Sequence, residues 1–117
     1  MKLFESERHV MEVLWEKGPL PAGEIARELA RCIGWNRNTT YTIIKRCIEK
    51  GAVQRQEPGF LCRALVTREE AQREEMTELI DKRFGGSNAA FLSAFLDGRT
   101  LSSEEIDQLR QLVEELR

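Results

Sequence analysis

Between residues 36 and 50, polar and apolar side chains alternate in a way that would suit a helix bound to nucleic acid. Thr40, Ile43, Ile44 and Cys47 recur at the i, i+3, i+4, i+7 spacing of a helix face turned toward a core. The opposite surface and the first turn would carry polar side chains, namely Arg37, Asn38, Thr39, Tyr41, Thr42, Lys45, Arg46 and Glu49. Asparagine can bond adenine, arginine can bond guanine, threonine methyls meet thymine methyls, and hydroxyls reach phosphates. The pattern favours a DNA-reading helix over an ordinary solvated helix face.

The elements around this helix predict a helix-turn-helix with a wing. Asn36 is the expected N-cap of the helix, and Gly51 ends it. Two helices should precede it, one over 6–17 with Ser6 as its N-cap and one over 22–32. Their buried residues are expected to be Val10, Val13, Leu14 and Trp15 in the first helix, and Ile25, Ala26, Leu29 and Ala30 in the second.

After Gly51 the apolar period approaches two, which is typical of strands. We expect strands over 52–57 and 60–65, joined at Pro58-Gly59 in a hairpin. This hairpin would be the wing, and three of its side chains could contact the sugar-phosphate backbone of DNA: Arg55, Gln56 and Arg63.

The rest of the chain is predicted to be helical and to form a dimer. Capping boxes at 67–70 and 102–105 open helices, and a short helix over 87–96 is apolar on nearly all sides. About 50 residues bury too little apolar surface alone, so a second copy of the segment is the simplest cover. Folding back onto the first segment is the alternative. The expected dimer residues are Leu79, Ile80, Phe84, Phe91, Leu92, Phe95, Ile106, Leu109, Leu112 and Val113.

The predicted fold class is therefore mostly α with a small β component (α+β). A winged helix-turn-helix DNA-binding domain should occupy residues 1–66, and a three-helix dimerisation domain residues 67–117. The charge distribution follows the same division. The 117 residues carry a net charge of −2, but residues 1–66 hold 11 Lys and Arg against 8 Asp and Glu, whereas residues 67–117 hold 7 against 12. The basic half is the one expected to bind DNA.

The sequence shows no motif of an enzyme active site, a metal site or a cofactor site. His9 is the single histidine, and the chain has no Gly-rich phosphate loop and no metal-ligand spacing. The three cysteines, Cys32, Cys47 and Cys62, form no CxxC pair and fit a reducing cytoplasm better than a disulfide framework. No apolar run is long enough for a membrane span, and the N-terminus has no signal-peptide core. We expect a cytoplasmic protein that is not an enzyme, with no cofactor and no metal.

Several short motifs resemble the penicillinase-repressor family of the BlaI and MecI type. In the first half these are 10–20 (VMEVLWEKGPL), 24–26 (EIA), 34–39 (GWNRNT), 45–46 (KR) and 49–51 (EKG). In the second half they are 84–87 (FGGS), 101–102 (LS), 104–106 (EEI) and 109–110 (LR). The resemblance thus covers essentially the whole chain.

The resemblance implies a cytoplasmic homodimeric transcriptional repressor that binds an inverted-repeat operator in double-stranded DNA. It places the reading contacts of the family on Asn38, Thr39, Tyr41, Thr42 and Arg46. Two positions differ from the commoner family pattern. Arg37-Asn38 stands where a Pro-Lys pair is common, and Tyr41 stands where a basic residue is common, so the resemblance carries no operator sequence.

The family also suggests how repression could end. In its best-known relatives a membrane sensor protease triggers cleavage between Asn and Phe in the short dimer helix, and the aligned bond here joins Ala94 to Phe95. Phe95 matches the pattern and the asparagine does not, while both residues would be buried by dimer packing in any case. A regulator induced by a ligand, and a winged helix that serves as a protein–protein interaction module, are the alternatives.

Overall fold

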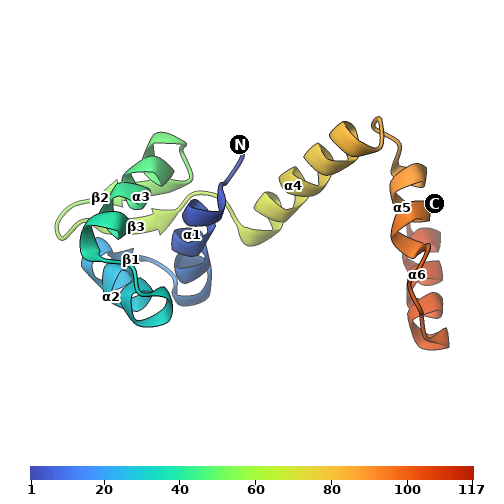
Figure 1. The fold of residues 1–117 in the computed structure, drawn as a ribbon, viewed down its shortest axis with the longest axis horizontal. Helices are drawn as coiled ribbons and strands as arrows, with labels where there is room; N and C mark the ends of the chain where they lie inside the picture. The colour runs from blue at the N-terminus through green and yellow to red at the C-terminus, as the bar shows by residue number, and fades with distance from the viewer. The chain divides into compact units, whose positions relative to one another are not determined.

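The computed structural model describes residues 1–117 and contains six helices and three short strands (Figure 1). In chain order these are α1 (Glu5–Lys17), β1 (Leu20–Pro21), α2 (Ala22–Ile33), α3 (Arg37–Glu49), β2 (Val53–Gln56), β3 (Leu61–Ala64), α4 (Arg68–Arg83), α5 (Asn88–Leu96) and α6 (Ser103–Glu115). The predicted fold class, mostly helical with a small sheet, is confirmed. The chain divides into two compact units, Met1–Glu78 and Leu79–Arg117, and each is described by itself.

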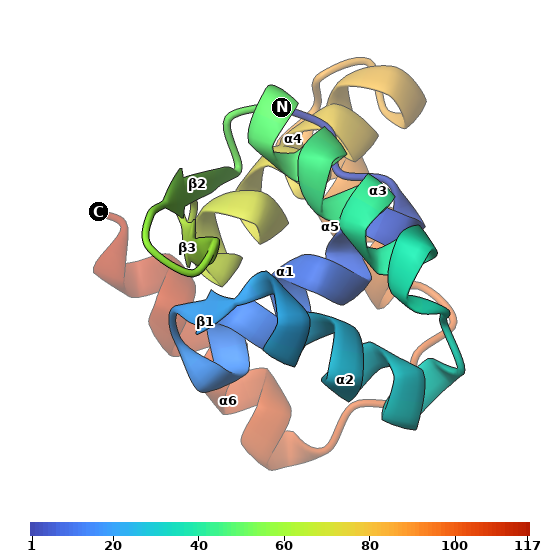
Figure 2. The same ribbon diagram turned by 90° about the vertical axis from the view of Figure 1, so that its left-hand side faces the viewer.

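The N-terminal unit combines three packed helices with a small antiparallel sheet of order β1-β3-β2 (Figure 2). The hairpin is in the predicted place, with Val53 opposite Ala64 and Gln56 opposite Leu61. The strand β1 was not predicted, because two residues are too few to show an alternating pattern. It pairs Leu20 with Cys62, so the sheet is joined directly to the start of α2.

The core of this unit lies between the three helices and the sheet. Its fully enclosed apolar side chains include Val10, Met11, Ile25, Ile44, Cys47, Val53 and Cys62. All four residues expected on the inner face of α3 are buried, Thr40 among them. The predicted inner face of α3 is therefore confirmed, and it fixes which side of the helix faces outward.

Two expectations about α1 and α2 were wrong, the N-cap at Ser6 and the burial of Ala30. The N-cap of α1 is Phe4 and not Ser6, because the Glu7 carboxylate accepts the Phe4 N–H at 2.8 Å and moves the start of the helix forward. Ala30 is exposed, since one residue turns about 100° away from the Leu29 stripe. Trp15 is only partly buried and packs at the margin of the core.

A buried ion pair joins α1 to the residue that follows α3. Glu7 is only 1% exposed, and its Oε1 lies 2.5 Å from the Lys50 Nζ. Lys50 also donates to the Lys2 carbonyl at 2.7 Å, and its ammonium lies 4.1 Å from the centre of the Phe4 ring. Lys50 therefore serves the fold, although it contributes to the positive charge of the basic segment.

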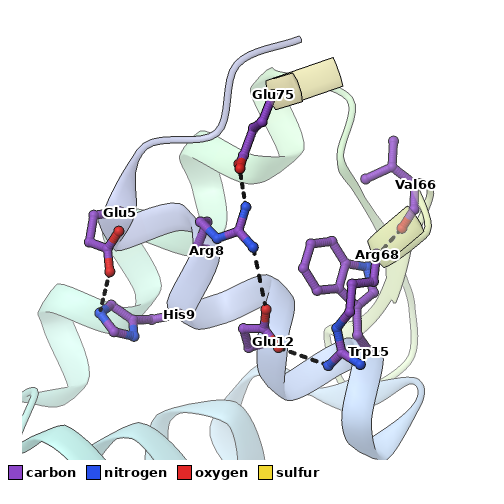
Figure 3. Close-up of polar contacts among 8 residues, drawn as sticks. All are labelled: Glu5, Arg8, His9, Glu12, Trp15, Val66, Arg68 and Glu75. Carbon is purple, nitrogen blue, oxygen red and sulfur yellow. Dashed lines mark hydrogen bonds and ion pairs between the residues drawn. The ribbon is translucent and has the colours of Figure 1, made fainter. Parts of the chain in front are cut away.

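Trp15 joins α1 to the loop before α4 and to the first turns of α4 (Figure 3). The indole N–H donates to the Val66 carbonyl at 2.9 Å, and the Arg68 guanidinium lies 5.6 Å from the ring centre. Arg68 also binds the Glu12 carboxylate at 2.8 Å. These contacts lie within the N-terminal unit and hold the beginning of α4 against α1.

The caps predicted at Thr67 and Ser102 are present, and Ser87 supplies a further cap that was not predicted. The Thr67 hydroxyl accepts the Glu70 N–H at 3.0 Å, and the Ser87 hydroxyl accepts the Ala90 N–H at 3.0 Å at the start of α5. Ser102 and Glu105 form the expected reciprocal capping box of α6. No helix of the chain has the length and apolar character that a membrane span requires.

The C-terminal unit buries very little of its apolar surface within one chain. Ile80 is its one buried residue, and neither α5 nor α6 has any. Phe91 lies between Phe84 and Phe95, with ring centres 5.6 and 6.2 Å apart. Of the residues expected at a dimer contact, Phe84, Phe91 and Leu109 are partly buried. Exposed members of the same set are Leu79, Leu92, Phe95, Ile106, Leu112 and Val113.

Candidate nucleic-acid interface

The helix α3 is capped at both ends, and its buried side fixes which residues face outward. The Asn36 side chain accepts the Thr39 N–H at 2.8 Å and begins the helix, and Gly51 follows the last turn with a left-handed φ of 81°. With Ile44 and Cys47 fully buried, the opposite side chains must point outward. Four of the predicted DNA-binding residues are exposed there, namely Asn38, Thr42, Lys45 and Arg46.

The cations on this exposed face are not neutralised by carboxylates of the same chain. Neither Lys45 nor Arg46 forms an ion pair. By contrast, Lys50 and Arg31, close to the two ends of α3, are paired with Glu7 and Glu28. Lys45 and Arg46 are therefore free to meet an external anion, and Asn38 and Thr42 beside them supply hydrogen-bonding groups without charge.

Arg37 and Tyr41 lie on the flank of α3 that faces the hairpin. Tyr41 is half-buried, and its hydroxyl accepts a hydrogen bond from Arg37 Nη2 at 3.0 Å. The Tyr41 ring meets Phe60 edge-on, with centres 5.7 Å apart and planes at 82°. Thr39, on the other side of the first turn, is half-buried. The predicted reading residues thus do not all face solvent, because Tyr41 packs against Phe60 and Arg37.

The three predicted wing residues occupy two faces of the hairpin. Arg55 lies opposite Cys62 in the register and Arg63 lies opposite Gln54. Because successive residues of a strand point to opposite faces, Arg55 shares the face of Cys62, whereas Gln56 and Arg63 share the other. The Arg63 guanidinium donates to Gln56 at 3.5 Å. The sequence indicated these residues as candidates but could not show which of them face the core, because that depends on how β2 and β3 pair.

Glu57, at the hairpin turn, was not predicted and contacts Arg55 directly. Its Oε1 accepts from Arg55 Nε at 2.7 Å, and its Oε2 accepts the Phe60 N–H at 3.2 Å. The hydrogen bond from the Phe60 N–H, and to a smaller extent the one from Arg55, holds the pKa of the Glu57 carboxyl below its ordinary value. The Glu57 carboxylate is therefore ionised at neutral pH and keeps Arg55 close to the turn.

The cysteines of this unit are placed for packing. Burial raises the pKa of Cys47 to about 12 and that of Cys62 to about 11, so both thiols are protonated at neutral pH. Cys32 is exposed, and its hydrogen bond to Glu28 also raises its pKa. No group of three or more His, Cys, Asp or Glu side chains gathers into a metal-binding arrangement.

Comparison with known proteins gives relatives over nearly the entire chain. The penicillinase repressor of Bacillus licheniformis is 26% identical over 116 residues, which cover 97% of this chain and 91% of the relative. The methicillin resistance regulatory protein MecI of Staphylococcus aureus is 25% identical over 114 residues, covering 96% of this chain and 93% of the relative.

A solved structure matches the N-terminal part of the fold. The solution structure of the DNA binding domain of the repressor BlaI superposes with a TM-score of 0.54 at 26% identity. The match covers 60% of this chain and 93% of that domain. The model of the family described as penicillinase repressor matches residues 3–115. Because this match spans almost the whole sequence, the chain belongs to the penicillinase repressor family.

Proposed function

We propose that this protein is a sequence-specific DNA-binding transcriptional repressor that acts as a homodimer on an inverted-repeat operator. The observation that carries the proposal is the outer face of α3, where Asn38, Thr42, Lys45 and Arg46 are exposed and the two cations are unpaired. Helix-turn-helix proteins place such a helix in the major groove, where its side chains meet base edges. The relative from Bacillus licheniformis is named as a penicillinase repressor, the relative from Staphylococcus aureus as a methicillin resistance regulatory protein, and the matching solved structure is that of a DNA-binding domain.

The proposed domain division follows the function of the two segments. Residues 1–66 would bind DNA, with Arg37, Thr39 and Tyr41 at the start of the reading helix and Arg55, Gln56 and Arg63 on the wing. Residues 67–117 would form the dimer. The compact N-terminal unit continues to Glu78, because the first turns of α4 pack against α1.

Dimerisation is supported by the uncovered apolar surface of the C-terminal unit. Leu92 and Phe95 of α5, and Ile106, Leu112 and Val113 of α6, are each 40% exposed or more. Large apolar side chains exposed in such number on two short helices are typical of an interaction surface. A two-fold dimer would cover it with the same surface of a second copy and would place two reading helices on the two halves of an inverted repeat.

The dependence of DNA binding on salt tests this proposal. Phosphate contacts release counterions, so log K should fall steeply and linearly with log salt concentration. The titration compares a duplex from upstream of the protein's own gene with a scrambled duplex of the same composition. We expect tighter binding to the upstream duplex at every salt concentration. Equal and weak binding of both duplexes at low salt would contradict the repressor function and favour the protein–protein interaction module.

Arg46→Ala should weaken operator binding by roughly 1–3 kcal/mol if the guanidinium contacts a base, with dimerisation unchanged. Fluorescence anisotropy with a labelled operator duplex measures the loss. Arg73→Ala is the matched control, since it removes the same charge from α4, outside α3 and the hairpin. A similar loss in both variants would show that Arg46 contributes only overall charge.

Cleavage between Ala94 and Phe95, triggered by a membrane sensor protease, stays a prediction of the resemblance. In the structure this bond lies inside α5, so cleavage would require local opening of the helix. Cutting there would separate α6 from the rest of the chain and weaken the dimer. Induction by a ligand stays the alternative, and both leave the proposed DNA-binding surface the same.

A further inference from the structure

Four side chains from α3 and the hairpin contact one another in the order cation, ring, ring, cation, namely Arg37, Tyr41, Phe60 and Arg55, and we call them the wing stack. The Arg37 guanidinium lies 5.0 Å from the centre of the Tyr41 ring. The Tyr41 and Phe60 rings form a T-shaped contact with their centres 5.7 Å apart. The Arg55 guanidinium lies 3.7 Å from the centre of the Phe60 ring. The wing stack therefore joins the first turn of the reading helix to the hairpin.

The backbone of Phe60 is fixed in an unusual conformation. Its φ of 51° is the one positive value among the non-glycine residues, and bulky residues rarely adopt such a conformation. The surroundings hold it there, because its N–H donates to Glu57 and its carbonyl accepts the Ala22 N–H at 2.9 Å. Non-glycine residues held in such conformations cluster at functional positions, and here the ring of Phe60 contacts Tyr41 and Arg55.

Glu57 occupies only one side of the Arg55 guanidinium. A single carboxylate oxygen of Glu57 accepts a hydrogen bond from Nε at 2.7 Å and lies 2.6 Å from Nη2 in the same ion pair. An arginine has five N–H groups, so the two on Nη1 and the second one on Nη2 stay open. Arg55 is 47% exposed and can thus bind a phosphate oxygen while it stays stacked on Phe60 and bonded to Glu57.

We propose that Tyr41 and Phe60 are positioning residues, which hold Arg37 and Arg55 in place for phosphate oxygens of the DNA backbone. This inference rests on the proposed DNA-binding function. Tyr41 then acts through its two neighbours and reads no base, although it lies on the reading helix. The benefit is preorganisation, because a guanidinium that is already stacked loses less side-chain freedom on binding than a free one.

A double-mutant cycle between Arg55 and Phe60 tests the positioning role. Operator affinity is measured for the unsubstituted protein, Arg55→Ala, Phe60→Leu and the double variant. If Phe60 positions Arg55, Arg55→Ala should weaken binding about fivefold in the unsubstituted protein and less than about twofold in the Phe60→Leu background, as coupled neighbours do. An equal penalty in both backgrounds would overturn the inference.

Arg63 is the matched control, because it lies on the same hairpin but on the face away from Phe60. The Arg63→Ala penalty should be the same with Phe60 or Leu at position 60. If it also disappears in the Phe60→Leu background, the substitution has merely loosened the hairpin and the positioning role is wrong. Absence of DNA binding by the unsubstituted protein would instead overturn the proposed function itself.

A second variant separates positioning from base reading at Tyr41. Tyr41→Leu should lower affinity for a set of operator duplexes, each with one base pair changed, and leave their order of affinity unchanged. A base contact would be lost selectively, so the affinity difference at one base pair would shrink. A changed order would show that Tyr41 reads a base, which contradicts the inference.

Discussion

Leu112→Glu should convert the protein to monomers and weaken operator binding roughly 100-fold or more, because the second half-site is then no longer bound intramolecularly. Leu112 is 58% exposed in the single chain, so the carboxylate costs the monomer little. In the proposed dimer the same position would be covered, and an unpaired buried charge would oppose association. Analytical ultracentrifugation and operator titration measure the two effects.

The control for this prediction is Gln111→Glu. Gln111 is also exposed on α6. The substitution introduces a carboxylate at a position turned about 100° from Leu112, on the polar side of the helix. This variant should remain dimeric and bind operator normally. If Leu112→Glu is also dimeric, the apolar stripe of α6 is not the dimer contact.

Lys50→Met should lower the free energy of unfolding by about 3–5 kcal/mol, since it leaves the buried Glu7 carboxylate without a cationic partner and with only the Phe4 N–H as a donor. Glu7 is 1% exposed, and Lys50 is its partner at 2.5 Å. Methionine keeps most of the length of the side chain but removes the charge, together with the hydrogen bond to the Lys2 carbonyl and the contact with the Phe4 ring. Urea denaturation followed by circular dichroism measures the change in the free energy of unfolding.

Lys45→Met makes the same substitution on α3 at an exposed lysine without an ion pair. It should change the free energy of unfolding by no more than about 0.5 kcal/mol, as is usual for surface positions. Equal denaturation midpoints for the two variants would mean that Glu7 finds water or another donor when Lys50 is replaced.

The outward face of the reading helix could be predicted because the spacing of its residues shows which side is buried. Four residues at helical spacing define the inner face, and once Thr40 and Cys47 point inward, Lys45 and Arg46 must point outward. The caps at Asn36, Thr67 and Ser102 could be predicted for a similar reason, because capping is a contact within three residues. Local rules of this kind also gave the hairpin turn.

Contacts between distant residues could not be predicted in the same way. Nothing near Glu7 in the sequence indicates that Lys50 neutralises it, so a glutamate in the core was unexpected. The charge count over residues 1–66 treated Lys50 and Arg55 as equal to Arg46, whereas the first two have carboxylate partners. Tyr41 falls on the outward side of α3 by spacing, and only the position of Phe60 shows that it faces the hairpin.

Selection of duplexes from a randomised DNA pool tests the central claim most directly. The protein is incubated with the pool at physiological salt, bound duplexes are recovered over several rounds, and the enriched sequences are read. A dimeric repressor with two reading helices should enrich an inverted repeat whose half-sites are about one helical turn, or a multiple of it, apart. Recovery of sequences no different from the starting pool would contradict sequence-specific DNA binding by this protein.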